Sequence, residues 1–509
     1  MDGRRGTVQP APGVDRGAAQ AIDGAVQPVS EPLALVPLAA AAGGGRLGAH
    51  EAQQLVAAGL TLLRRCAPLV RALSGKRSAI LLPATPAFFT ALAASDGRGA
   101  VLVNPLASPL EIAAQLAEAN VGAAFTVAAL AARLPAALPL VLMDDAPRAA
   151  RFVGHGATRD VDLGSHHGLS IEGERDVPGA DEEAAIVYTS GMAGRPLGAI
   201  LSHRNLLANA RSAVQAAAQT ADDHVLALLP FSHLFGFTVT AMAPLLAGAR
   251  VTTMERFAPS RAAELLAGGG ITEVVGVPAV FRALLAAIER GRAGVGALRL
   301  CICGGAPLAV DLQERWLEAT GVDLRQGYGL TEAAPVCLFN RVDRANVPGT
   351  LGFAFPGVEV TVRVPGAGDG DGGTPALATG DDGELCVRGD NVFRGYVGGA
   401  SGGLRRRDGW LYTGDRGVGN ADGTFTFRGL IKPMFTRNGF NIYPEEIRRA
   451  VLELAGVRSV DVRAIPEPTR EHDIGLDVTG SVSVDDVRRW CEQRLSSYKQ
   501  PSEILVSAA

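Results

Sequence analysis

Short apolar runs alternate with helix-like segments between about residue 50 and residue 340, and this alternation constrains the fold more than any other feature. Six runs are typical of buried strands: SAILL near 78, AVLVN near 100, AAIVYTS near 184, HVLALLP near 224, ITEVVGV near 271 and LRLCICGG near 298. One helix start is explicit, because Ser108-Pro109-Leu110-Glu111 combines a serine cap, a proline at the first helical position and a glutamate at the third. The alternation predicts α/β layers with largely parallel sheets.

The pattern changes after about residue 350. VEVTVRV, GELCVRG and TFTFRG are short strands with glycine turns, which indicates a small antiparallel subdomain. An α+β tail follows, with a helix that opens at Tyr443-Pro444-Glu445-Glu446 and stops at Gly456. The predicted fold class is therefore α/β: a large N-terminal domain of layered α/β subdomains plus a small antiparallel β subdomain, followed by a small α+β C-terminal lid domain.

These patterns also predict domain boundaries. Residues 1–30 are rich in Gly, Ala, Pro and Gln without periodicity, which indicates a flexible leader. The N-terminal domain is expected over 31–429, with its β-rich subdomain at about 345–429. The lid domain is expected over 430–509.

Composition excludes several classes of partner. The 509 residues carry 48 basic and 52 acidic side chains, so no large single-sign field indicates nucleic acid or an anionic membrane. Six scattered cysteines fit neither a disulfide framework nor a paired zinc site, so we expect a cytoplasmic protein. PLALVPLAAAAGGG is too short and too interrupted to cross a membrane, so no integral membrane segment is predicted. The oligomeric state stays open.

A first glycine-rich segment is Tyr188-Thr189-Ser190-Gly191-Met192-Ala193-Gly194-Arg195-Pro196-Leu197-Gly198. It follows a buried strand and precedes the helical segment HRNLLANARSAV, so its backbone N–H groups could hold a phosphate. No Gly-Lys-Ser/Thr closes the loop, which excludes a Walker loop. A purely structural strand-to-helix turn is the alternative.

A second segment, Gln326-Gly327-Tyr328-Gly329-Leu330-Thr331-Glu332, follows the strand and turn Cys301-Ile302-Cys303-Gly304-Gly305-Ala306. Its glycines let backbone approach a ligand closely. Tyr328 offers a ring face for a base, Thr331 a hydroxyl for phosphate and Glu332 an oxygen for magnesium. The alternative is a surface turn with a solvated glutamate. Both cysteines are interpreted as core residues.

A third segment, Gly409-Trp410-Leu411-Tyr412-Thr413-Gly414-Asp415, precedes Phe427-Arg428-Gly429 and the run from Arg437 to Pro444. An aspartate at this position can accept hydrogen bonds from both ribose hydroxyls. A turn-capping role is the alternative.

In this order, the motifs resemble those of the adenylate-forming superfamily, which includes acyl-CoA synthetases, nonribosomal peptide adenylation domains and beetle luciferases. YTSGMAGRPLG is similar to the family's phosphate loop, YTSGTTGxPKG. LPFSHLFGF, CGGAPL and GYGLTE resemble its acyl-pocket and adenine/magnesium motifs, and YTGD and GFNIYPEEI its ribose and lid motifs. The resemblance covers about residues 50–506.

The resemblance implies that a carboxylic acid reacts with ATP and Mg²⁺ to give an acyl-adenylate, and that a thiol, usually coenzyme A, then takes the acyl group. Such catalysis rests on positioning and on charge neutralisation, since two anions must meet. LPFSHLFGF favours a medium- or long-chain fatty acid. The alternatives are a ligase that loads an acyl carrier protein or releases acyl-AMP, and a degenerate relative that binds nucleotide or acyl-CoA without adenylation.

The resemblance also implies roles for individual residues. The implied nucleotide- and CoA-binding residues are Thr189, Ser190, Gly191, Gly194, Gly304, Gly305, Ala306, Gln326, Gly327, Tyr328, Gly329, Asp415, Gly439 and Phe440. The implied catalytic residues are Thr331, Glu332, His233 and Lys432. Glu332 would bind Mg²⁺, and Lys432 would lie at the hinge of the lid. The implied acyl-pocket residues are Phe231, His233, Val277, Gly304 and Gly305.

The chain departs from the family pattern at several positions. Met192, Ala193 and Leu197 stand where the family has two threonines and a lysine, and Leu430 stands where it has an arginine. The chain ends at YKQPSEILVSAA, before the Gly-Lys whose lysine serves adenylation in the family, and Lys499 lies too early to replace it. We therefore expect a truncated lid domain and impaired activity.

Overall fold

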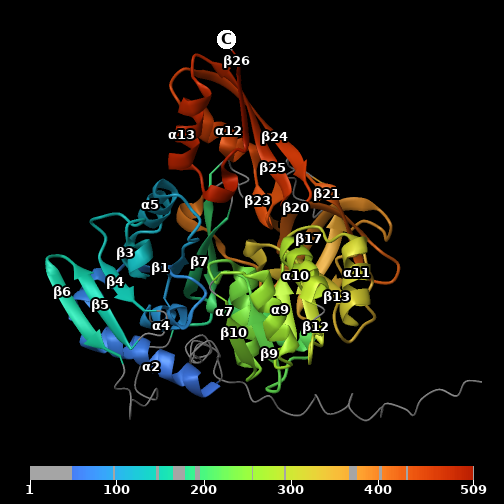
Figure 1. Ribbon diagram of the computed structural model, residues 1–509, viewed down its shortest axis with the longest axis horizontal. Coiled ribbons are helices and arrows are strands. Elements are labelled where there is room, and N and C mark those ends of the chain that lie inside the picture. Colours follow the sequence, from blue (N-terminus) through green and yellow to red (C-terminus); the bar gives the residue numbers. More distant parts are fainter. Residues whose placement is uncertain are drawn as a thin grey trace, which may run out of the picture.

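A computed structural model describes residues 49–95, 98–144, 148–163, 178–189, 195–254, 256–291, 294–365, 375–400, 404–431 and 434–507. The predicted leader, most of the predicted phosphate loop (190–194) and the predicted hinge residue Lys432 lie outside these ranges. Figure 1 shows a broad body made of three sheets, with the C-terminal residues above it.

The first sheet has nine strands in the order β18-β8-β7-β2-β1-β3-β4-β5-β6. Its strands are β1 (Arg77–Leu81), β2 (Ala100–Leu102), β3 (Val121–Thr126), β4 (Leu140–Met143), β5 (Ala149–Gly154), β6 (Ala157–Asp162), β7 (Glu183–Thr189), β8 (Leu197–Ser202) and β18 (Gly395–Tyr396). The five central strands, β7 to β4 in this order, are parallel, as predicted. The pairs beyond β7 and β4 are antiparallel, and the sequence reading did not predict them.

Helices around this sheet are α2 (Ala49–Arg65), α3 (Ala67–Leu73), α4 (Pro86–Ala94), α5 (Pro109–Glu118) and α6 (Ala128–Ala131). Every residue of α4 is buried, because this helix is apolar all round. The predicted start of α5 is confirmed: Glu111 N–H donates to Ser108 Oγ at 3.2 Å, and Ser108 N–H donates to Glu111 Oε2 at 2.7 Å.

The second sheet has seven strands in the order β10-β9-β11-β12-β13-β14-β15. These strands are β9 (His224–Ala227), β10 (Arg250–Thr253), β11 (Glu273–Gly276), β12 (Leu300–Cys303), β13 (Leu324–Gly329), β14 (Val336–Phe339) and β15 (Phe353–Ala354). Its helices are α7 (His203–Ala217), the π-helix η3 (Phe235–Met242), α8 (Ala243–Leu246), α9 (Pro259–Ala267), α10 (Pro278–Gly291), α11 (Val310–Thr320) and the 3₁₀ helix η4 (Thr331–Ala333).

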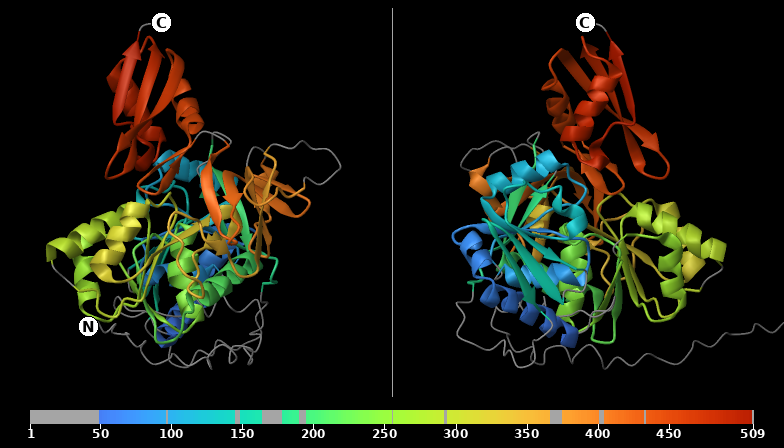
Figure 2. Two further views of the ribbon diagram at one scale, coloured as in Figure 1. Left: turned by 90° about the vertical axis from the view of Figure 1, so that its right-hand side faces the viewer. Right: turned by 60° about the vertical axis from the view of Figure 1, so that its left-hand side comes forward.

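Both faces of this second sheet are covered, which explains its unbroken apolar strands. In β12, Ile302 packs into one hydrophobic cluster, while Cys301 and Cys303 pack into another on the opposite face. The interpretation of these two cysteines as core residues is therefore confirmed. Figure 2 shows helices on either side of the strands.

The third sheet is entirely antiparallel, as predicted. It consists of β16 (Val358–Arg363), β17 (Asp382–Gly389), β19 (Arg405–Arg407), β20 (Trp410–Gly419) and β21 (Phe425–Leu430). The short 3₁₀ helix η5 (Val397–Gly399) follows β18. The central strand β20 carries Asp415 toward the other two sheets.

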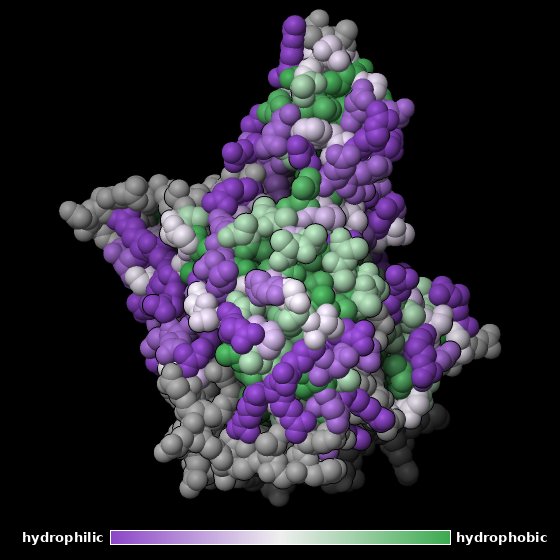
Figure 3. Space-filling view, turned by 90° about the vertical axis from the view of Figure 1, so that its left-hand side faces the viewer, coloured by the Kyte–Doolittle hydropathy of each residue, from purple (hydrophilic) through white to green (hydrophobic). Residues whose placement is uncertain are grey.

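The C-terminal residues form the hairpin β22 (Phe435–Arg437) and β23 (Phe440–Ile442), then α12 (Pro444–Leu452), β24 (Val457–Glu467), β25 (Glu471–Gly480), α13 (Val484–Arg494), η6 (Ser497–Lys499) and β26 (Glu503–Ser507). A separate hydrophobic cluster lies within this segment. Figure 3 shows the segment standing above the body, with hydrophobic side chains gathered across the middle of the face below it. The exact domain boundaries stay predictions.

Within the described ranges, no helix combines the length and the apolar character that crossing a membrane requires.

Candidate active site

The largest concentration of predicted site residues lines one cavity of about 250 Å³, where the first two sheets, the third sheet and the C-terminal hairpin meet. Its predicted lining residues are Thr189, His233, Gly305, Ala306, Gln326, Gly327, Tyr328, Gly329, Thr331, Glu332, Asp415, Gly439 and Phe440. Several of them follow the carboxyl ends of β12 and β13, the edge at which open parallel sheets bind ligands.

The predicted strand-to-helix phosphate loop is wrong in its architecture. β7 and β8 are antiparallel, with Thr189 opposite Leu197, so the segment between them joins two strands of a hairpin. Helix α7 begins only after β8, where Ser202 caps it by accepting from Asn205 N–H at 3.2 Å. The loop therefore does not lead directly into a helix N-terminus. Ser190, Gly191 and Gly194 lie outside the described residues.

Tyr328 and Asp415 are hydrogen-bonded to each other, although 87 residues separate them in the chain. The Tyr328 hydroxyl donates to Asp415 Oδ2 at 2.6 Å. Burial raises the pKa of Asp415 to about 7, against the lowering effect of this hydrogen bond. Leu430 lies opposite Asp415 in the β20–β21 ladder and lines the same cavity. The predicted adenine and ribose residues are thus adjacent.

Glu332 is a buried carboxylate at the cavity wall, in η4. It is 6% exposed, and its Oε1 accepts from the Tyr396 hydroxyl at 2.7 Å. Burial raises the pKa of Glu332. No group of three or more His, Cys, Asp or Glu side chains among the described residues could hold a metal ion. This setting suits Mg²⁺, which often takes one or two protein carboxylates and completes its shell with phosphate oxygens and water.

His233 lies between β9 and the π-helix η3 and lines the cavity floor. Phe235 N–H donates to its Nδ1 at 3.3 Å, which places the proton of the neutral ring on Nε2. Surrounding protein lowers the pKa of His233, so the ring is neutral near pH 7. A π-helix is rare and often occurs at functional sites, as here beside His233.

A second, mostly apolar cavity of about 60 Å³ adjoins the first, and His233 and Gly305 line both. Gly304 keeps this space open, because a Cβ there would lie 3.1 Å from both the Phe235 ring and Gly327 O. Other residues on its wall include Ala213, Ala217, Gln219, Val239, Ile302 and Phe339. This cavity has the composition of a site for an apolar group.

Two predicted acyl-pocket residues line neither of these two cavities. Phe231 is fully buried and packs against the rings of Phe88 and Phe89 at centroid distances of 5.5 Å. Val277 is covered by the C-terminal hairpin, since a Cβ added to Gly439 would lie 2.8 Å from its Cγ1.

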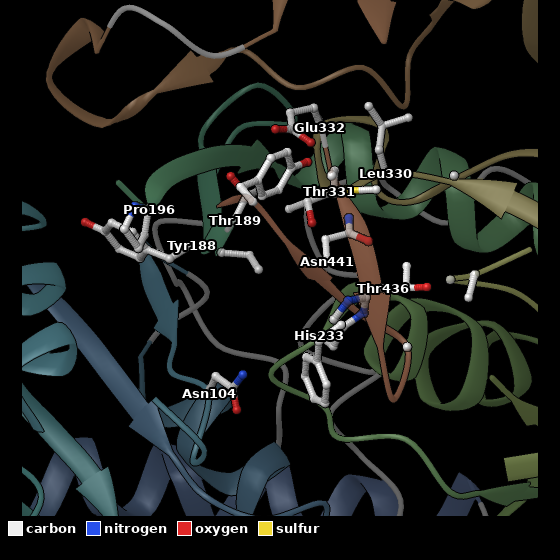
Figure 4. Close-up of a pocket in the computed structure, with 18 of the residues that line it drawn as sticks. Asn104, Tyr188, Thr189, Pro196, His233, Leu330, Thr331, Glu332, Thr436 and Asn441 are labelled. Atoms are coloured by element: carbon white, nitrogen blue, oxygen red, sulfur yellow. The ribbon is translucent and has the colours of Figure 1, made fainter. Parts of the chain in front are cut away.

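The tip of the C-terminal hairpin lines the first cavity with Gly439 and Phe440. The resemblance implies that these two residues bind CoA. Gly439 has φ +76° at this tip, and Phe440 stacks on Tyr498 with a centroid distance of 4.3 Å. Figure 4 shows Thr436 and Asn441 of this hairpin beside Thr331 and His233.

Sequence reasoning missed a buried charge cluster that joins the C-terminal segment to the body. Lys499 Nζ lies 2.6 Å from Glu446 Oε1 and 3.1 Å from Glu111 Oε1. Ser496 Oγ also donates to Glu111 Oε2 at 2.5 Å. Burial alone would lower the pKa of Lys499, but the carboxylates raise it. The only sequence signal was the cap at Glu111, and it did not indicate a distant partner.

Comparisons with known proteins identify the family of the chain. The family of AMP-binding enzymes matches residues 64–397. A feruloyl-CoA synthase of an Amycolatopsis species is 34% identical over 337 residues, 65% of this chain and 67% of that relative. A long-chain-fatty-acid–CoA ligase of Bacillus subtilis is 28% identical over 335 residues, 64% of this chain and 59% of that relative.

Solved structures show the same fold. A malonyl-CoA ligase with methylmalonyl-CoA and AMP bound has a TM-score of 0.72 at 26% identity, over 90% of this chain and 93% of that one. ATP-bound MatB from Rhodopseudomonas palustris has a TM-score of 0.63 at 26% identity, over 89% and 88% of the two chains. The predicted resemblance is confirmed, and the chain belongs to the AMP-binding enzyme family.

Proposed function

We propose that this protein joins a carboxylic acid to coenzyme A at the expense of ATP. The observation that carries the proposal is the convergence of Glu332, the Tyr328–Asp415 pair and the hairpin tip at Gly439 on one cavity. Adenylate-forming CoA ligases use ATP, Mg²⁺ and CoA, and one solved relative holds ATP while another holds methylmalonyl-CoA and AMP. ATP supplies the AMP group that activates the acid, and Mg²⁺ neutralises phosphate charge.

The cavity residues have roles that follow from their chemistry. The ionised Asp415 would accept hydrogen bonds from the ribose hydroxyls, and the Tyr328 ring would pack on the adenine. Glu332 would hold Mg²⁺, with Thr331 bonded to phosphate. His233, neutral and protonated on Nε2, would donate to a carboxylate oxygen of the acid and so fix its orientation.

The orientation of the C-terminal segment supports the thiol-transfer half-reaction. The hairpin tip that would line the thiol tunnel already lies in the cavity. A lid that rotates about a hinge at Lys432 remains part of the proposal.

The size of the second cavity favours some acyl groups over others. A volume of about 60 Å³ is less than half of the roughly 150 Å³ of a cavity that holds one benzene ring, so by itself the second cavity suits a short acyl group, and an aromatic group would also occupy part of the adjoining cavity. The relative named feruloyl-CoA synthase is in line with an aromatic acid. A medium- or long-chain fatty acid, favoured by LPFSHLFGF and by the relative from Bacillus subtilis, is the second candidate.

The departures in the phosphate loop also support slow adenylation. Leu197 is 1% exposed and apolar, so it brings no charge to the phosphates where the family has a lysine.

All six cysteines are buried and free, which favours a reducing cytoplasm.

The test is to incubate the full chain with ATP, Mg²⁺ and a panel of aromatic, short and long acids, and to quantify AMP, pyrophosphate and acyl thioester. Coenzyme A and a phosphopantetheinylated acyl carrier protein are compared as acceptors. Thioester of CoA equal in amount to AMP supports the proposal. Pyrophosphate without thioester supports an acyl-AMP ligase, and nucleotide binding without AMP for every acid supports a degenerate binder.

A further inference from the structure

The carboxylate that would bind Mg²⁺ is hydrogen-bonded to a residue from a distant part of the chain. The hydroxyl of Tyr396, at the end of β18, donates to Glu332 Oε1 at 2.7 Å. In the part of the chain that the structure describes, no other side chain is hydrogen-bonded to this carboxylate. Both residues line the first cavity, where Figure 4 shows Glu332 near Thr331. The bond takes Oε1 and not Oε2, so one oxygen remains to bind a cation.

The hydroxyl proton of Tyr396 has a fixed direction. Leu404 N–H donates to the Tyr396 oxygen at 3.1 Å, and a backbone N–H can only donate. Among the described residues, the hydroxyl proton has Glu332 as its acceptor and no other. Leu404, Tyr396 and Glu332 therefore form a chain of hydrogen bonds that ends on the carboxylate.

Tyr396 is itself held by packing and by the first sheet. Its side chain is 8% exposed, and its ring packs edge-on against Phe393 at a centroid distance of 4.8 Å. Its backbone pairs with Ala199 of β8. Phe393 N–H also donates to the backbone oxygen of Glu332 at 2.8 Å. Residues 393–396 thus hold both the main chain and the side chain of Glu332 in place.

We propose that Tyr396 is a positioning residue that orients the Glu332 carboxylate toward Mg²⁺-ATP. The inference rests on the proposed CoA-ligase function. A free glutamate side chain loses rotamer freedom when it binds an ion, and a hydrogen bond that already fixes the side chain removes part of that cost. Removing such a partner of a metal-ligating side chain typically weakens metal binding by about 10- to 100-fold.

The test is Tyr396→Phe, which removes the hydroxyl and keeps the ring against Phe393. Calorimetric titration of the full chain measures two dissociation constants: that of ATP with saturating Mg²⁺, and that of AMP with EDTA, a ligand that needs no ion. We expect the variant to bind Mg²⁺-ATP about tenfold more weakly and AMP as tightly as the parent. A merely structural role of Tyr396 would weaken the binding of both ligands alike.

Tyr412→Phe is the matched control. Tyr412 is also buried, but it packs with Cys386 and Trp410 and lines neither cavity. This control should bind both ligands as the parent does. The double variant of Tyr396→Phe and Glu332→Gln should bind Mg²⁺-ATP no more weakly than Glu332→Gln alone, because the hydroxyl acts only through this carboxylate.

The outcomes separate two failures. Unchanged affinity of Tyr396→Phe for Mg²⁺-ATP, or an equal loss for AMP, would overturn the role of Tyr396 while leaving the ligase function intact. An additive loss in the double variant, or an equal loss in Tyr412→Phe, would also overturn it. No binding of Mg²⁺-ATP by the parent would overturn the proposed function itself.

Discussion

Asp415 and Glu332 are carboxylates in the wall of the first cavity, and Glu273 is a fully buried carboxylate that lines neither cavity. Each has a specific neighbour that holds it. Asp415 accepts from Tyr328, Glu332 from Tyr396, and Glu273 from both Gln219 and Arg299. Burial raises the pKa of Asp415 and of Glu273 to about 7. Keeping such groups ionised costs folding free energy, which is typical of sites selected for binding.

Asp415→Asn separates the cost of an ionised Asp415 to folding from its contribution to nucleotide binding. The folded pKa of Asp415 is above its unfolded value of 3.8, so the native state holds more protons between pH 4 and 7, and this residue lowers the free energy of unfolding as pH rises through that window. The variant should be more stable than the parent at pH 8 by about 1 to 2 kcal/mol. Chemical denaturation at pH 5 and pH 8 measures this, and an equal effect at both values would contradict it.

The same variant should bind ATP at least tenfold more weakly at pH 8, since charge-assisted hydrogen bonds to the ribose contribute about 1.5 to 3 kcal/mol. In the parent, the ATP dissociation constant should rise as pH falls below about 7, because Asp415 becomes protonated. In Asp415→Asn this pH dependence should weaken to that of the ATP phosphates alone. Calorimetric titration between pH 6 and 8 tests both; affinity within twofold of the parent would place the ribose elsewhere.

Glu332→Gln removes the charge but keeps an oxygen to accept from the Tyr396 hydroxyl. The variant should fold normally and lose Mg²⁺-dependent ATP affinity by at least tenfold, since it replaces the expected carboxylate ligand. ATP binding measured over a Mg²⁺ series provides the readout. A Mg²⁺ dependence identical to that of the parent would show that another group binds the ion.

Among the helices and strands, those with buried apolar runs could be predicted from the sequence. Exposed strands, and strands too close in the chain to another motif, could not. Strands such as β11 and β12 are buried on both faces, so their apolar runs predicted them. The edge strand β6 (Ala157–Asp162) is mostly exposed and polar, so no apolar run marked it. β8 was missed because its apolar residues follow the glycine-rich segment so closely that the segment was interpreted as leading into α7.

The hairpin β22–β23 is the element whose position matters most for thiol transfer. Gly439→Ala should displace its tip, because the added Cβ would lie 2.8 Å from Val277 Cγ1. Gly409→Ala is the matched control: Gly409 has φ +78°, and an added Cβ there would lie 3.5 Å from the Arg388 side chain, an ordinary contact distance. Both variants should lose about 1 kcal/mol of stability. Only Gly439→Ala should slow the reaction of supplied acyl-adenylate with CoA, by about tenfold in single turnovers; equal rates would contradict the assignment.

At the scale of the whole molecule, contacts between distant segments decide how the C-terminal segment is placed, and these were not predictable. The bond from Lys499 to Glu111 joins residues 388 positions apart, and local patterns carry no information about such a pair. The motifs predicted which residues converge at the cavity, whereas the bond from Tyr396 to Glu332 and this charge cluster required the packed fold.

Glu111→Gln tests whether the charge cluster docks the C-terminal segment. The amide can still cap α5 through Ser108 N–H, but Lys499 loses one of its two buried carboxylates. We expect a larger radius of gyration by solution scattering and slower thioester formation. Glu118→Gln, on the same helix but in a half-exposed pair with Arg195, should change neither. An unchanged radius and rate in Glu111→Gln would show that other contacts hold the segment.

We expect this chain to activate an acid by transferring AMP to its carboxylate. The most direct measurement uses the best acid of the panel, labelled with ¹⁸O in both carboxylate oxygens, with ATP, Mg²⁺ and CoA. Attack of the carboxylate on the α-phosphorus, followed by loss of AMP to the CoA thiol, must leave one ¹⁸O on each AMP released. Mass spectrometry should find one labelled oxygen per AMP and one thioester per AMP. Unlabelled AMP, or ADP as the nucleotide product, would show that AMP is not transferred to the acid.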